Sequence, residues 1–177
     1  MSILQGKNIN LRALEPEDID FLFSTENDES FWEISSTQIP FSKYILQKYI
    51  ENAHQNIYEA KQYRFVICNR HNKPVGTIDL FDFNPQHLRV GIGILITSKY
   101  QSKGYGFEAL EIIIAYAFNY LNVHQIYANI TSDNLTSISL FEKFQFKKVG
   151  IKKDWMYSNS TFKDEILYQL IKNTHES

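Results

Sequence analysis

Six residues, Gln101–Gly106 (QSKGYG), combine glycines, small polar side chains and a lysine in a pattern that suits the binding of a phosphate group. They lie between an apolar run at 92–96, typical of a strand, and an amphipathic run at 107–121, typical of a helix. The two glycines permit backbone conformations that a Cβ atom disfavours, so that successive N–H groups can turn toward one anion. The N–H groups that begin the helix lack intrahelical acceptors, and the helix dipole adds to the attraction. An ordinary glycine-containing turn between strand and helix remains the alternative.

Two other phosphate-binding patterns do not fit. GIG at 91–93 resembles the start of a dinucleotide fingerprint, but the third glycine would fall at Ile96, and the glycines lie inside a predicted strand. No G-x-x-x-x-G-K-[ST] pattern occurs in the sequence. A Rossmann site and a P-loop are therefore excluded as interpretations.

Composition bounds the class of protein. With 177 residues, 44% of them hydrophobic, the chain is long enough for one domain with a sizeable core. The formal charge of −2 indicates no nucleic-acid partner, and the single cysteine, Cys68, excludes an intramolecular disulfide framework. The sequence contains neither a membrane-spanning apolar stretch nor a signal pattern. We therefore expect a single domain, 1–177, in the reducing cytoplasm, without a membrane partner.

Strand and helix patterns alternate along the chain. The turn-forming clusters at 69–73, 84–87 and 158–160 separate runs of β character, and Ser42 is a plausible N-cap. The segment 28–41 has no clean period and is expected to be a loop or a short helix bordering a cleft. The patterns predict an α/β fold with a mixed sheet covered by helices. The expected strands are 7–13, 63–68, 75–83, 89–96, 125–130, 147–155 and 161–171, and the expected helices are 15–27, 42–60, 107–121 and 135–144.

Two segments, ILITSKYQSKGYGFEAL and NITSDNLTSISLFEKFQFKKVG, together resemble the GNAT superfamily of acetyl-CoA-dependent N-acetyltransferases. The first matches the family's pyrophosphate motif, Gln/Arg-x-x-Gly-x-Gly/Ala, and the second matches its Asn…Ser…Leu-Phe-Glu-Lys…Phe helix. INLRALEPEDIDFLF and VGTIDLFDFN look like the branch that contains ribosomal-protein alanine and spermidine or diamine N-acetyltransferases. The resemblance implies a GNAT-like, mostly antiparallel central sheet whose strands splay around the acyl-CoA site.

The resemblance also assigns a cofactor site. In such enzymes the strand before the glycine loop pairs with the pantetheine arm, and the loop N–H groups bind the pyrophosphate. Lys103 is expected either to contact a phosphate or to be simply solvated. Asn134 matches a cofactor-contacting asparagine, although an asparagine is also a good helix cap. The acetyl-CoA residues implied are Ile94, Leu95, Ile96, Gln101, Ser102, Lys103, Gly104, Tyr105, Gly106, Asn134 and Phe141.

Amine acetylation needs a group that takes a proton, because an alkyl ammonium has a pKa of about 10.4. Asp82 and Asp79 match positions where the polyamine branch carries glutamates. Three residues apart on one strand, they point to opposite faces unless a bulge intervenes, so we expect only one in the cleft, with Asp82 preferred. His87 is a weaker candidate base. A solvated carboxylate at a strand end is the alternative for each aspartate.

The sequence departs from the family pattern at three positions. Phe141 stands where many relatives have a tyrosine that protonates the leaving thiolate, and phenylalanine has no such proton. A thiol pKa of about 8.5 lets the thiolate leave and take a proton from solvent. Gly91 stands where polyamine enzymes have a glutamate, which weakens the polyamine assignment, and Gln145 replaces a usual glycine.

The acceptor site is expected in the least patterned segment. Glu33, Trp32 and Phe31, with Glu29 beside them, combine carboxylates and aromatic faces that suit a cationic amine, although core packing explains the aromatic residues equally well. The function that the resemblance implies is transfer of an acetyl group from acetyl-CoA to a polyamine, diamine or protein N-terminal amine by direct attack in a ternary complex. No metal is expected, and a homodimer or larger homo-oligomer is possible. A non-catalytic acyl-CoA sensor or interaction module is the alternative.

Overall fold

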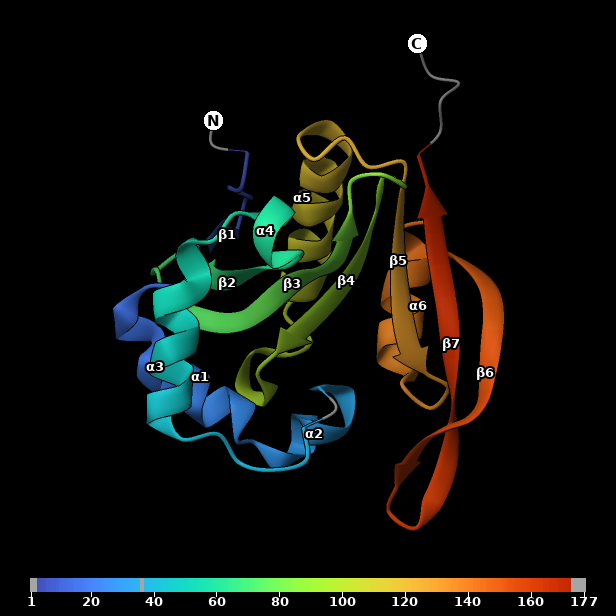
Figure 1. Ribbon diagram of the computed structural model, residues 1–177, viewed down its shortest axis with the longest axis horizontal. Coiled ribbons are helices and arrows are strands. Elements are labelled where there is room, and N and C mark those ends of the chain that lie inside the picture. Colours follow the sequence, from blue (N-terminus) through green and yellow to red (C-terminus); the bar gives the residue numbers. More distant parts are fainter. Residues whose placement is uncertain (1–2, 36, 173–177) are drawn as a thin grey trace.

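The computed structural model of the chain describes residues 3–35 and 37–172, and it contains a seven-stranded sheet of order β1-β2-β3-β4-β5-β7-β6 (Figure 1). Neighbouring strands are antiparallel except for β4 and β5, which are parallel. The predicted α/β class with a mixed, mostly antiparallel sheet is confirmed. The strands are β1 (Ile9–Arg12), β2 (Tyr63–Asn69), β3 (Pro74–Asn84), β4 (Arg89–Ile96), β5 (Gln125–Thr131), β6 (Lys147–Ser158) and β7 (Thr161–Ile171).

Helices cover both faces of this sheet. The α-helices are α1 (Ile19–Glu26), α2 (Glu29–Ser35), α3 (Lys43–Glu51), α4 (Ile57–Ala60), α5 (Tyr105–Asn119) and α6 (Leu135–Lys143), and the 3₁₀ turns are η1 (Pro16–Asp18), η2 (Asn52–His54) and η3 (Ser98–Tyr100). Helices α5 and α6 share one hydrophobic cluster with the strands, and α1 and α3 share a second. None of the helices that the structure describes is long and apolar enough to cross a membrane.

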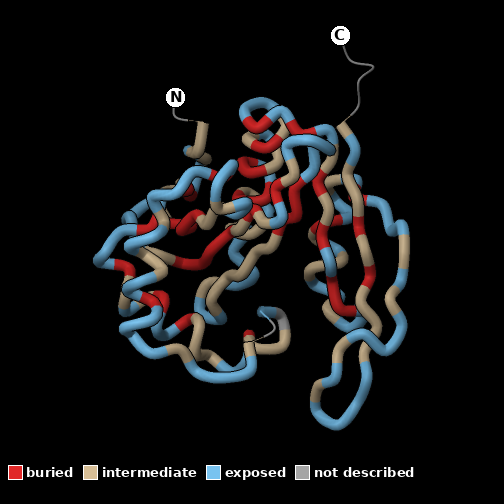
Figure 2. The backbone as a smooth tube through the Cα atoms, viewed as in Figure 1, coloured by how far each residue is buried: buried red, intermediate tan, exposed pale blue. Residues whose placement is uncertain are grey.

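The side-chain alternation of β2 explains why there are two clusters. Phe65 and Ile67 belong to the cluster under α5, whereas Val66 and Cys68 belong to the cluster under α1 and α3. Successive side chains of a strand point to opposite faces, so this run of apolar residues is buried on both sides of the sheet. Figure 2 shows the most deeply buried backbone in the central strands and α5, with the outer hairpin largely exposed.

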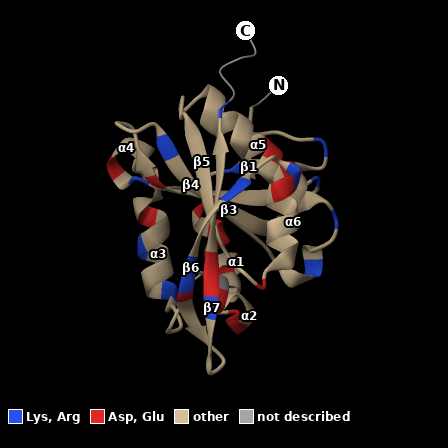
Figure 3. Cartoon of the chain, turned by 90° about the vertical axis from the view of Figure 1, so that its right-hand side faces the viewer, with Lys and Arg blue, Asp and Glu red and all other residues tan. Residues whose placement is uncertain are grey.

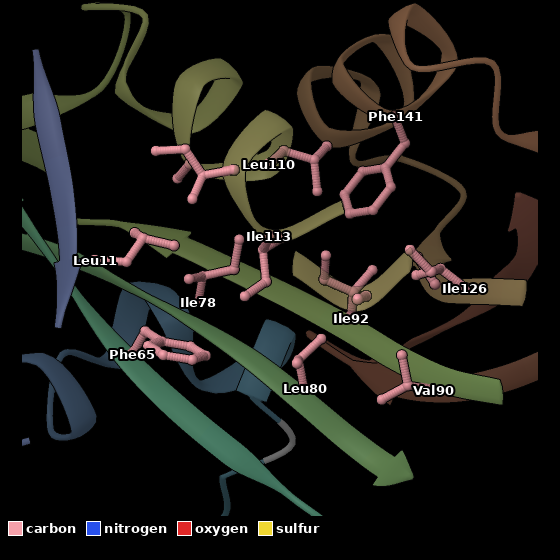
Figure 4. Close-up of a cluster of buried hydrophobic side chains, with 14 of the residues drawn as sticks. Leu11, Phe65, Ile78, Leu80, Val90, Ile92, Leu110, Ile113, Ile126 and Phe141 are labelled. Atoms are coloured by element: carbon pink, nitrogen blue, oxygen red, sulfur yellow. The ribbon is translucent and has the colours of Figure 1, made fainter. Parts of the chain in front are cut away.

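The larger cluster extends across the sheet from β1 to β7. Leu110 and Ile113 of α5 and Phe141 of α6 point toward the strands (Figure 4). Ile92 of β4 and Ile126 of β5 meet them from the sheet. Burial of each such side chain contributes about 1.5–3 kcal/mol to the stability of the fold. The packing of α5 and α6 therefore holds strands β1–β4 and strands β5–β7 together where β4 and β5 do not pair.

The expected single helix at 42–60 is wrong in its length. Ser42 is the predicted N-cap and its hydroxyl accepts from the Ile45 N–H at 3.2 Å, but α3 ends at Glu51. Asn56 then starts α4, because its side chain accepts from the N–H groups of Tyr58 and Glu59. The residue pattern at 42–60 predicted one continuous helix, but the capping asparagine begins a second helix within it. The segment 28–41 contains α2, the short helix that was one of the two expectations for it.

Candidate active site

Strands β4 and β5 separate partway along their length. They pair only from Arg89↔Gln125 to Gly91↔Tyr127, whereas β4 continues to Ile96 with β3 as its other neighbour. The main chain of β4 after Gly91 therefore has an edge that β5 does not pair. Unpaired strand edges offer N–H and C=O groups to another extended chain. The splayed strands that the resemblance implied are present here (Figure 1).

A cavity of about 390 Å³ occupies the gap, and we call it the β4–β5 cleft. Its walls come from both strands, from α6 and from α2, and they include Met156 of β6 and Glu165 of β7. Of the predicted cofactor residues, Ile94, Asn134 and Phe141 line it, whereas Leu95, Ile96 and the loop residues 101–106 do not. The residues that line it are Glu33, Ser35, Phe81, Ile92, Gly93, Ile94, Ala128, Asn129, Ile130, Thr131, Asn134, Ser137, Phe141, Met156 and Glu165.

The loop before α5 has left-handed backbone at one of the two predicted glycines, Gly104, and also at Ser102. Gly104 has φ +80° and precedes the first residue of α5, and Ser102 has φ 59°. Gly106 lies inside α5, and a Cβ atom there would be 3.6 Å from its nearest neighbours, Ile96 and Leu140. Only Gly104 therefore needs glycine for its conformation. The Lys103 ammonium lies over the Tyr100 ring at 5.0 Å.

Asn134 and Phe141 have structural roles within α6. The Asn134 side chain accepts from the Ser137 N–H at 3.1 Å and caps the helix. Phe141 is 2% exposed and packs edge to face on Phe146. Both also line the β4–β5 cleft. The sequence left helix capping by Asn134 and core packing of Phe141 as alternatives to cofactor contact, and both structural roles are present. Cofactor contact stays a prediction for both residues.

A second cavity, of about 580 Å³, lies between α2 and β6, and we call it the α2–β6 pocket. Trp32 and Glu33, two of the predicted acceptor residues, line it, whereas Phe31 is buried in the protein interior and does not. Three residues line both cavities, namely Glu33, Met156 and Glu165. The two cavities therefore meet at a junction that carries two carboxylates.

An ion-pair network fixes Glu33. Its Oε1 accepts from the Lys163 ammonium at 2.5 Å, and its Oε2 accepts from the Ser158 hydroxyl at 3.0 Å. Lys163 also contacts Asp133 at 2.6 Å, and this hydrogen bond lowers the pKa of Asp133 below its ordinary value. The network joins α2, β7 and the start of α6, and the charged segments of α2, β6 and β7 lie together at the lower end of Figure 3.

Glu165 was not predicted from the sequence. Its Oε1 accepts from Lys152 at 2.5 Å, and its side chain is 15% exposed. Asp164 beside it shapes the facing strand, because one oxygen accepts from the Asp154 N–H and the other pairs with Lys153. The β6–β7 register shifts between Lys152 and Met156, so this bulge directs Met156 to the junction. The sequence predicted this hairpin. It did not predict the bulge, because no local sequence pattern marks it, and so it did not assign Met156 or Glu165 to a site.

Asp79 is held by an arginine. Arg64 donates to its two carboxylate oxygens at 2.7 Å each and also to Glu26. Arg64 lies on β2, directly opposite Asp79 in the β2–β3 register. Asp79 does not line the β4–β5 cleft. Its geometry accounts for a structural ion pair, and the catalytic role that we predicted for it has no support from its position.

The sequence analysis expected Asp79 and Asp82 to point to opposite faces unless a bulge intervened. Asp82 lies at such a bulge. It has φ 48°, and the β3–β4 register shifts between Phe81 and Asn84. Its carboxylate is exposed and accepts from the Tyr127 hydroxyl at 3.2 Å. Burial and this carboxylate raise the pKa of Tyr127 to about 12. Asp82 lines neither cavity, nor does His87 in the following turn, so their roles as bases stay predictions.

The described residues, 3–35 and 37–172, contain no group of three or more His, Cys, Asp or Glu side chains that could hold a metal ion. The junction carries carboxylates and ammonium groups beside a cleft with a free strand edge. Such a site can bind a cationic amine and exchange protons with it.

Comparison with known proteins identifies related chains. Residues 8–147 match the family model described as an acetyltransferase (GNAT) domain. An uncharacterized N-acetyltransferase of Bacillus subtilis, derived from the SPbeta prophage, is 26% identical over 97% of this chain and 94% of its own. Spermidine N(1)-acetyltransferase of Vibrio cholerae is 25% identical over 90% of each chain. The crystal structure of the Vibrio cholerae enzyme with CoA and spermine superposes with a TM-score of 0.84 at 23% identity, over 92% of this chain and 95% of the other.

Proposed function

Because the chain belongs to the GNAT acetyltransferase family, we propose that it transfers an acetyl group from acetyl-CoA to a primary amine, with residues 1–177 acting as one N-acetyltransferase domain. A polyamine or diamine is the first candidate acceptor, and a protein N-terminal amine is the second. The family and the relatives named spermidine N(1)-acetyltransferase both support amine N-acetyltransferase activity.

The observation that carries the proposal is the separation of β4 from β5 after Gly91. The free edge of β4 suits the amide groups of a pantetheine arm, which pair with main chain as a strand does. The loop at Gly104 and the first N–H groups of α5 suit the pyrophosphate. A Cβ atom at Gly104 would have no neighbour within 4 Å, so the loop is open on that side. The residues present therefore fit an acyl-CoA, whose thioester supplies the activated acetyl group.

The α2–β6 pocket is the proposed acceptor site. Glu29 and Glu33 supply negative charge, and Trp32 and Trp155 supply aromatic faces. This combination favours ammonium groups through ion pairing and cation–π contact. The CoA and spermine complex of the Vibrio cholerae relative supports a polycationic acceptor for this chain. Because the pocket meets the cleft at Glu33, an amine held there can approach a thioester in the cleft.

The proposed reaction is a direct attack in a ternary complex. The acceptor nitrogen attacks the thioester carbonyl carbon while the carbon–sulfur bond breaks. Phe141 lines the cleft and offers no proton, so the thiolate leaves as an anion and is protonated by water, which its ordinary pKa of about 8.5 permits.

Two measurements test the proposal. Isothermal titration of the purified protein with CoA is expected to show one site. An assay of free-thiol release is then expected to show turnover with spermidine, spermine, an alanine-terminated peptide or an amino sugar nucleotide. Absence of CoA binding would refute the proposal. CoA binding without turnover on any of these amines would favour the non-catalytic sensor instead.

A further inference from the structure

We propose that Glu165 is the catalytic residue that removes a proton from the acceptor ammonium, with its Oε2 as the accepting atom. This inference rests on the proposed function and assigns a role that the sequence interpretation gave to Asp82 and Asp79. Glu165 is one of two carboxylates, among the residues that the structure describes, that line both the β4–β5 cleft and the α2–β6 pocket. A base for this reaction must reach the amine at the place from which its nitrogen attacks the thioester.

The strand register directs Glu165 into the cleft. Glu165 pairs with Thr131, the last residue of β5, which lies beyond the point where β4 and β5 separate. The next residue, Ile166, is buried in the core cluster below the sheet. Neighbouring side chains on a strand point to opposite faces, so Glu165 points away from that core and toward the junction. Its side chain is mostly, but not fully, shielded from water.

The hydrogen-bond partners distinguish Glu165 from the other carboxylates. Both oxygens of Glu33 are engaged, by Lys163 and Ser158, and both oxygens of Asp79 are engaged by Arg64. Glu165 uses only Oε1, for Lys152. Within the described part of the chain, its Oε2 accepts no hydrogen bond and is not one of the fully buried, unsatisfied atoms. Oε2 is thus an open acceptor atom at the junction, whereas Oε1 carries the Lys152 contact.

The proton balance of the step is complete. The acceptor arrives as an ammonium, and Glu165 Oε2 takes one proton and frees the nitrogen lone pair. The carbon–nitrogen bond forms, the carbon–sulfur bond breaks, and its electron pair leaves on sulfur. The second nitrogen proton passes through water to the thiolate, and Glu165 returns its proton to solvent. The charged groups near this carboxylate are Lys152 of β6, Glu33 of α2 and Lys163 of β7.

The experiment compares Glu165→Gln with Lys152→Gln in the full chain. Both variants remove the same ion pair, but only the first removes the carboxylate. Glu165→Gln is expected to lower kcat/KM for the amine by about 10²-fold or more at neutral pH, with CoA affinity within about twofold. The loss is expected to shrink as pH rises toward the amine pKa, because more of the amine is then already neutral. Lys152→Gln is expected to stay within about threefold of wild type.

Three outcomes would overturn the inference: Glu165→Gln activity close to wild type, an equal loss in both variants, or a loss that does not depend on pH. If Glu165→Gln does not fold, Glu165→Asp serves instead. It keeps the charge but withdraws the carboxylate by one methylene, and a wild-type kcat in that variant would equally overturn the role. Wild-type protein that binds CoA but acetylates no amine would refute the proposed function itself, which separates the two failures.

Discussion

Gly91 and Phe81 share one space on the sheet. They are partners in the β3–β4 register, and a Cβ atom on Gly91 would lie 2.3 Å from Cε2 of the Phe81 ring. Phe81 also lines the β4–β5 cleft. The glycine that departs from the polyamine pattern is therefore explained by packing, because the aromatic ring covers the glycine across the strands. A side chain at position 91 requires the ring to move.

Gly91→Ala is expected to lower the free energy of unfolding by about 1–3 kcal/mol through overpacking against Phe81. Gly93→Ala is the matched control on the same strand, because a Cβ atom there would be 3.8 Å from the same ring, an ordinary contact. Its effect should stay within about 0.5 kcal/mol. Urea denaturation measures both, and equal effects of the two substitutions would contradict the packing argument.

At this scale, sequence reasoning identified residue types better than residue roles. It assigned Trp32 and Glu33 to an acceptor site, and both line the α2–β6 pocket. It named Asp79 as the second candidate base because of its place in the family pattern, and nothing near Asp79 in sequence reveals that Arg64, on the neighbouring strand, binds it. It missed Glu165 for the same reason. Whether a carboxylate has an oxygen without a hydrogen-bond partner depends on residues of the neighbouring strand, and only the pairing of the strands brings these residues together.

The element that we propose for binding the pyrophosphate is α5 together with the loop before it. A fifteen-residue helix has a dipole and free N–H groups at its start, and Gly104 sets the angle at which the loop enters it. The sequence predicted the strand, loop and helix in the correct order because each has its own local pattern. It could not predict that one glycine adopts positive φ while the other is helical, since glycine accepts both conformations.

Gly104→Ala is expected to destabilise the loop by about 1–2 kcal/mol, because a Cβ atom disfavours the left-handed conformation. CoA affinity should fall by about tenfold if that cost falls on the bound state. Gly106→Ala is the control, because the position is helical and a Cβ atom there makes only ordinary contacts. Alanine also favours a helix over glycine by about 1 kcal/mol. Thermal unfolding and CoA titration of both variants test this, and a larger loss in Gly106→Ala would contradict it.

At the scale of the molecule, the sheet consists of two parts joined by a short seam. Strands β1–β4 form a run of antiparallel neighbours and β5–β7 a second, with three residue pairs between β4 and β5. The larger core cluster bridges the seam, whereas the smaller cluster under α1 and α3 lies beside β2 alone. Beyond these three pairs β4 and β5 separate around the β4–β5 cleft. The larger core cluster is therefore continuous across both parts, while the edge of β4 stays unpaired. Self-association of the chain stays a prediction.

An ion pair beside Cys68 of the smaller cluster makes the free energy of unfolding depend on pH. Arg12 of β1 donates to both oxygens of Asp18 at 2.7 and 2.8 Å, and the Glu15 N–H donates to the same carboxylate. Burial alone would raise the pKa of Asp18, but these hydrogen bonds outweigh it, so the pKa lies below its ordinary value. The charged form is therefore favoured in the folded state, and its contribution is lost as pH falls from the ordinary carboxyl range through the folded pKa.

Asp18→Asn is accordingly expected to lower the free energy of unfolding by about 1–3 kcal/mol at neutral pH, because a hydrogen bond between charged groups is lost. The difference from wild type should narrow below about pH 4, where the wild-type carboxylate begins to be protonated. Asp20→Asn is the control, since Asp20 is 79% exposed in its pair with Lys43 and should change stability by less than about 1 kcal/mol. Urea denaturation across the acid range measures this. A difference between Asp18→Asn and wild type that stays constant down to pH 2 would show that Asp18 stabilises the fold by packing rather than by its charge.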